Sequence, residues 1–84
     1  MNNVHFNKNI RVNGHFIHFA FFRMQTINGV KYHVSTLDQN KTPVVFDMQL
    51  RDHEWKISED SKVPEWVMNL ERELEMIIFN NDLS

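Results

Sequence analysis

The chain has 84 residues with a formal net charge of −2, and it contains no Cys. That length fits one domain, and a chain without Cys has no disulfide, no thiolate metal site and no Cys nucleophile. No segment has the ~20 consecutive apolar residues that cross a bilayer, and the first residues lack the continuous apolar region of a signal peptide, so we expect a single cytoplasmic domain over residues 1–84 with no membrane role.

Two Asn-Gly pairs predict the first two reversals of the chain. Asn13-Gly14 and Asn28-Gly29 each lie between segments rich in β-branched and aromatic residues. A type I′ turn needs positive φ at both central residues, which Asn and Gly tolerate best, so each pair predicts a two-residue β-hairpin. The strands expected around these turns are Val4–Val12, His15–Ile27 and Val30–Leu37.

The two turns also fix which residues lie opposite one another. The first places Phe6 beside Phe21, and the second places Phe21 beside Thr36. Because side chains alternate between the faces of a strand, both registers gather apolar residues on the same face. We expect this face to be the core side of the sheet. Its members are Val4, Phe6, Ile10, Val12, Ile17, Phe19, Phe21, Ile27, Val30, Tyr32 and Val34.

Two more strands are expected after a loop that begins at Asp38. Val44–Arg51 alternates apolar and polar residues, as a half-buried strand does. A turn at Asp52–Glu54 then leads to a short strand at Trp55–Ser58. The pattern therefore predicts a five-strand antiparallel meander.

The last part of the chain predicts one amphipathic helix over about residues 62–80. Asp60 or Ser61 can cap it, and Pro64 is compatible with its first turn. The expected fold is α+β, with this helix packed on one face of the sheet and with a fraying tail at residues 80–84. The apolar stripe of the helix contains Val63, Trp66, Val67, Leu70, Leu74, Ile77 and Ile78.

Charge is unevenly distributed along the chain. Residues 1–58 hold seven Lys/Arg and four Asp/Glu, hence +3, whereas residues 59–84 hold two Lys/Arg and seven Asp/Glu, hence −5. The predicted helix is therefore acidic, and its carboxylates are interpreted as a solvated face.

A helix on one side leaves the other face of the sheet open. Its members are His5, Arg11, Phe16, His18, Ala20, Phe22, Met24, Lys31, His33, Ser35 and Leu37. A sheet face in water is normally polar, and exposed apolar groups with a polar rim indicate an interaction site. The candidate interaction residues are Phe16, His18, Phe22, Met24 and His33.

Three interpretations of this face remain open. The sheet curls and loops cover it, or it forms a homodimer or another protein interface, or it binds single-stranded nucleic acid. In the last case Phe16 and Phe22 stack on bases while Arg11 and Lys31 contact phosphates. The function expected first is a non-enzymatic interaction module, homodimeric, that uses the open face or the helix flank.

The helix flank is the second surface considered. Met68, Met76 and Phe79 lie outside the apolar stripe. They either pack across a dimer axis or are simply exposed, as isolated apolar residues often are.

Metal and catalytic chemistry find little support in the sequence. His5, His18 and His33 share the open face, but the predicted register places Phe22 between the first and the last and leaves those two about one residue pair out of line. We therefore expect no metal site and no cofactor. Asp47 is interpreted as an ion-pair partner of the nearby cations Arg51 and Lys56. No nucleophile–base pair is recognised, so no catalytic residue is assigned and the protein is expected not to be an enzyme.

Overall fold

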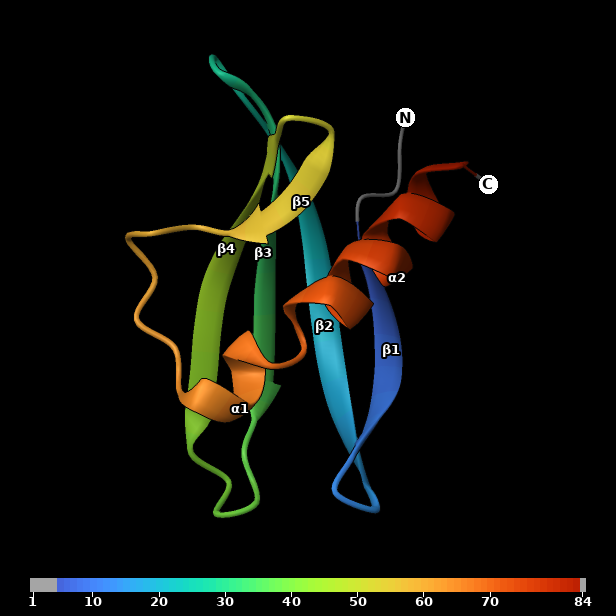
Figure 1. Ribbon diagram of the computed structural model, residues 1–84, viewed down its shortest axis with the longest axis vertical. Coiled ribbons are helices and arrows are strands. Elements are labelled where there is room, and N and C mark those ends of the chain that lie inside the picture. Colours follow the sequence, from blue (N-terminus) through green and yellow to red (C-terminus); the bar gives the residue numbers. More distant parts are fainter. Residues whose placement is uncertain (1–4, 84) are drawn as a thin grey trace.

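The computed structural model describes the backbone of residues 5–83 and the side chains of residues 5–81. It confirms the α+β fold: a curled antiparallel meander with strands in the order β1-β2-β3-β4-β5, followed by helix (Figure 1). Val4, expected in the first strand and in the core, lies outside the described residues. The elements are β1 (His5–Val12), β2 (His15–Thr26), β3 (Gly29–Leu37), β4 (Pro43–Arg51), β5 (Glu54–Ile57), α1 (Glu65–Met68) and α2 (Glu71–Leu83).

The first reversal forms as predicted. Asn13 has a φ of 52° and Gly14 a φ of 84°, the two positive values that a type I′ turn requires. The β1–β2 pairing then places Phe6 opposite Phe21. The turn residues therefore fix the register of the first hairpin.

The second reversal differs from the prediction by one residue. It lies at Ile27 and Asn28, and Gly29 is already the first residue of β3. Only Gly29 has a positive φ there (117°), and the Thr26 hydroxyl accepts a hydrogen bond from the Asn28 N–H at 3.2 Å. In this turn only the last residue needs a positive φ, and Gly29 occupies that position. Ile27 therefore lies at the tip of the hairpin, where it is fully exposed, and is not a core residue.

This change moves the β2–β3 pairing by two residues. Phe21 lies opposite Val34, not opposite Thr36. Because side chains alternate with a period of two, a two-residue shift keeps every side chain on its predicted face. The faces are therefore correct although the register is not.

The helical region is two segments, not one helix over residues 62–80. The Leu70 N–H bonds to the Val67 carbonyl, a tighter turn that separates α1 from α2. Ser61 caps no helix; its hydroxyl accepts the Asp47 N–H at 3.0 Å and fastens the connection to β4. The helix extends as far as Leu83, beyond the end at about residue 80 that the sequence predicts.

The core forms between the sheet and the helical segments. α2 lies obliquely across the side of the sheet that we call the helix-covered face (Figure 1). The predicted helical stripe faces it, and Tyr32 packs edge-on against Trp55 with ring centroids 5.1 Å apart. No helix in the described part of the chain is long and apolar enough to cross a membrane. The buried apolar residues are Ile10, Ile17, Phe19, Phe21, Tyr32, Val34, Phe46, Met48, Trp55, Ile57, Val67, Leu70, Leu74 and Ile78.

Two of the helix carboxylates are not part of a solvated face. Glu75 accepts the Trp55 N–H at 2.9 Å, and Glu71 accepts the Ile57 N–H at 2.8 Å. These N–H groups point away from β4, along the outer edge of β5. One turn of α2 therefore satisfies the donors of an edge strand, which otherwise attract further strands.

Candidate interaction surface

The face of the sheet opposite α2, here called the open face, holds all five predicted interaction residues. Phe16, at 72%, is the most exposed apolar side chain on it. Phe22 and Met24 are about two-fifths exposed, His18 is exposed and His33 is half-buried. The helical segments pack on the other face, so the prediction that this face lies opposite the helix holds. The exposed apolar residues on the open face are Phe16, Phe22, Met24, Leu37 and Val45.

One row of side chains crosses four strands of the open face. Phe22 stacks on His5 with ring centroids 4.5 Å apart and planes 8° apart, and it meets the His33 ring at 6.5 Å. The His33 Nδ1–H then donates to Asp47 Oδ1 at 2.8 Å. This row places the two imidazoles in line, whereas the sequence analysis placed them out of line. The cause is the two-residue change of the β2–β3 register. The members are His5, Phe22, His33 and Asp47, which pair strand by strand.

Asp47 is the electrostatic centre of this row. Partial burial raises the pKa of its carboxyl, but hydrogen bonds and positive charge from His33 and Lys31 lower the pKa, and the net value lies below the usual 3.8. The Lys31 ammonium donates to Asp47 Oδ2 at 3.3 Å. The expected pairing of Asp47 with Arg51 or Lys56 is wrong, because Arg51 lies beside Glu59 and Lys56 lies beside Glu54.

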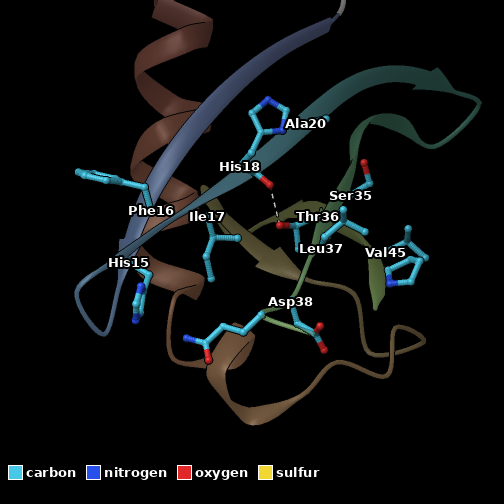
Figure 2. Close-up of a pocket in the computed structure, with 12 residues that line it drawn as sticks. His15, Phe16, Ile17, His18, Ala20, Ser35, Thr36, Leu37, Asp38 and Val45 are labelled. Carbon is cyan, nitrogen blue, oxygen red and sulfur yellow. Dashed lines mark hydrogen bonds between the residues drawn. The ribbon is translucent and has the colours of Figure 1, made fainter. Parts of the chain in front are cut away.

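A groove opens where β2 and β3 separate. Their pairing ends at Phe19 and Thr36, and beyond it the Thr36 hydroxyl donates to the His18 carbonyl at 2.6 Å. The groove holds about 780 Å³. Figure 2 shows this hydrogen bond between the two strands, with Leu37 and Val45 on one side and the Phe16 ring directed outward on the other. The remaining lining comes from His15, Ile17, Ala20, Ser35, Asp38, Gln39 and Pro43.

The four residues expected to contact nucleic acid are not equivalent in the structure. Arg11 lies opposite the exposed Phe16, so one cation and one ring are adjacent. Lys31 is bound to Asp47, and Phe22 is stacked on His5. Only the pair Arg11 and Phe16 therefore presents both a free ring face and a cation next to it.

Metal binding and catalysis gain no support from the geometry. Among the described residues, no group of three or more His, Asp and Glu side chains could hold a metal ion. Asp47 orients His33 as it would a general base, but within residues 5–83 no hydroxyl hydrogen-bonds to that imidazole. Among the side chains of residues 5–81, every buried polar atom has a hydrogen-bond partner.

Sequence reasoning did not identify Val45 and Pro43 as surface residues of the groove. Val45 alternates with the buried Phe46 along β4 and therefore lies on the open face. Its role depends on the separation of β2 and β3, which no local pattern reveals. The signal that was available is its apolar character at a position where a solvated face is normally polar.

The comparisons with known proteins add no functional assignment. No protein family, no curated protein and no solved structure matches this chain.

Proposed function

We propose that this chain is a non-enzymatic interaction module that binds a protein partner through the open face. The observation that carries the proposal is the exposure of apolar side chains around the groove between β2 and β3. Apolar groups gathered on a surface and rimmed by polar ones are typical of protein interaction sites. The partner expected here inserts an apolar side chain between Leu37 and Val45 and covers the Phe16 ring.

The size of the open face fits such an interface. The molecule measures 35 × 26 × 19 Å, and Figure 1, viewed down the shortest dimension, shows the sheet across the two longer ones. A standard interface buries ~800 Å² on each partner, which a face of these dimensions can supply. The polar groups around the groove, among them His18, Ser35 and Asp38, provide the hydrogen bonds of a rim.

Binding of single-stranded nucleic acid is the second candidate, and one observation favours it. Arg11 and Phe16 lie opposite each other on adjacent strands, and a base can stack on the ring while the guanidinium meets a phosphate. One such pair provides little electrostatic affinity, and the net charge of the chain is −2. A protein partner therefore explains more of the exposed surface, since it also covers Leu37 and Val45.

Photo-cross-linking tests the proposal directly. In one variant a benzophenone side chain replaces Phe16, and the protein is expressed in the cells that naturally make it. The matched control carries the same group at Ile27, which is fully exposed at a hairpin tip away from the open face. We expect a discrete cross-linked protein from position 16 and none from position 27. Equal products from both positions, or none from position 16, would contradict the proposal.

A second variant links that product to the groove. Leu37→Asp places a charge beside Val45 without affecting the core, so the fold is expected to remain while the cross-link from position 16 disappears. Circular dichroism and thermal unfolding check the fold. A labelled oligonucleotide titrated at low and high salt separates the second candidate: affinity that falls with salt and requires Arg11 would favour nucleic acid.

A further inference from the structure

The two edge strands of the sheet differ in the partners of their outward backbone groups. At the β5 edge, the outward N–H groups of Trp55 and Ile57 donate to the carboxylates of Glu75 and Glu71. At the β1 edge, no strand among residues 5–83 pairs with the outer side of β1. An edge strand with open backbone groups is a template for another strand.

The hairpin geometry identifies the open backbone groups. In a two-residue hairpin the residues that flank the turn form a hydrogen-bonded pair, so Val12 and every second residue before it bond to β2. The N–H and C=O groups of Asn7 and Asn9 therefore point outward. The same rule predicts that the Trp55 and Ile57 N–H groups leave β5 on its outer side, where the structure has them.

A groove follows the β1 edge on its helix side. It holds about 440 Å³ between β1 and α2, with Phe6 and Ile77 half-buried in it. Met76, which also lines the groove, is 53% exposed, and Phe79 on the neighbouring surface of α2 is 50% exposed. Backbone donors and acceptors, a groove lined by both apolar and polar side chains, and two exposed apolar side chains thus lie along one border of the molecule.

We infer that this border binds a second copy of the chain, with β1 pairing antiparallel to the β1 of the partner copy. A two-fold axis perpendicular to the sheet joins the two sheets into one and places both α2 helices on the same side of it. The contact is then isologous, with each β1 edge serving as donor and acceptor for the other.

The charges along this border favour a second copy. Lys8 and Arg11 make β1 basic, whereas Glu73 on the groove side of α2 is acidic. In the described part of the chain neither Lys8 nor Glu73 has an ion-pair partner. The two-fold axis brings the basic strand of each copy toward the acidic helix of the other, and both charges gain a partner.

The exposed side chains of α2 distinguish a second copy from a single added peptide strand. A peptide strand beside β1 fills the groove and covers Met76, which lines it, but leaves Phe79 in water. A second copy brings its own α2, against which these two side chains pack. In one register Lys8 lies directly opposite Lys8 of the second copy, and like-charge repulsion disfavours it. We therefore expect Asn7 or Asn9 to lie on the two-fold axis, opposite the same residue of the second copy.

Because the chain has no Cys, single Cys variants report the contact without background. Asn7→Cys and Asn9→Cys test the two registers, since Cα atoms opposite each other in adjacent strands are within disulfide range. Gln49→Cys, exposed on the open face of β4, is the matched control. We expect a disulfide-linked dimer from Asn7→Cys or Asn9→Cys and none from Gln49→Cys.

Light scattering over a concentration series provides the second measurement. Asn9→Pro removes an outward N–H and leaves the bonds to β2, so it is expected to raise the dimer dissociation constant about tenfold or more, whereas Asn9→Ala is not. A monomer at high micromolar concentration without cross-links from positions 7 and 9 would overturn the inference. So would a dimer that cross-links only from position 49. Neither result bears on a partner bound at Phe16, so the two proposals fail independently.

Discussion

The two faces of the sheet carry similar residue types but have opposite environments, and the neighbours Phe21 and Phe22 show this directly. Phe21 is 0% exposed beneath the helical segments, whereas Phe22 is 38% exposed on the open face. Both rings are stacked, Phe21 on Phe6 and Phe22 on His5. Apolar character alone therefore does not distinguish core from surface in this chain. What distinguishes them is which face α2 covers.

This difference also separates stability from recognition. The helix-covered face holds the apolar groups whose removal from water stabilises the fold, and the open face holds groups that a partner would remove from water. Substitutions on the first face are expected to change the free energy of unfolding. Substitutions on the second are expected to change binding with little effect on folding.

The largest expected effect comes from the pair Phe21→Ala and Phe22→Ala. Removal of the buried Phe21 ring is expected to cost about 3–5 kcal/mol, which is close to the whole stability of a domain of this size. Removal of the half-exposed Phe22 ring is expected to cost about 1 kcal/mol. Urea unfolding followed by circular dichroism measures both. Equal costs would show that the open face is covered in solution.

The second-largest effect on stability is expected from removal of the Glu71 carboxylate, which accepts a hydrogen bond at the β5 edge. Glu71→Ala leaves the Ile57 N–H without its partner, at an expected cost of about 1–3 kcal/mol. Arg72→Ala, an exposed position on the same helix outside the proposed dimer contact, is the control and is expected to change stability by less than about 0.5 kcal/mol. Similar costs for both variants would mean that the hydrogen bond to Ile57 contributes nothing.

A smaller, pH-dependent effect is expected at Asp47. Its pKa is lower in the folded protein than in the unfolded chain, so its contribution is complete above the unfolded value of 3.8 and is lost as the pH falls through the lower folded value. Asp47→Asn should cost less than about 1 kcal/mol at pH 7, because the ion pairs are partly solvated. Unfolding curves of both proteins should converge below pH 3.8. A constant difference down to the lowest pH would contradict this assignment.

The smallest expected effect on stability is at Phe16. Because the ring is 72% exposed, Phe16→Ser is expected to change the unfolding free energy by no more than about 0.5 kcal/mol. Thermal unfolding beside the wild-type protein measures it. Severe destabilisation would show that Phe16 belongs to the core and that the comparison of the two faces is wrong.

The sequence was sufficient to predict the two faces because a period-two pattern tolerates an error of two residues. The second turn was misplaced by one residue and the pairing by two, yet Tyr32 and Val34 kept their predicted side. The exposed tip at Ile27 was missed because the prediction assigned Gly29 to the turn itself. In the structure Gly29 comes directly after the turn, as the first residue of β3, and it has its positive φ there.

Features that no residue pattern marks were not predictable in the same way. The separation of α1 from α2 involves a single hydrogen bond from the Leu70 N–H to the Val67 carbonyl. The roles of Glu71 and Glu75 require β5 beside α2, and their spacing alone matches that of any acidic helix. The groove beside Val45 exists because β2 and β3 stop pairing, and no residue pattern marks that point.

The position of α2 after β1 to β5 in the chain has a consequence for synthesis. A ribosome makes β1 to β5 before α2, the segment that covers Phe19, Phe21 and Tyr32. The apolar face of the nascent sheet is therefore exposed to solvent until translation of α2 is complete. Hydrogen bonding at the β5 edge is likewise incomplete until then. Ribosome-bound chains stalled before residue 71 should therefore recruit chaperones strongly, and release from them should coincide with docking of α2.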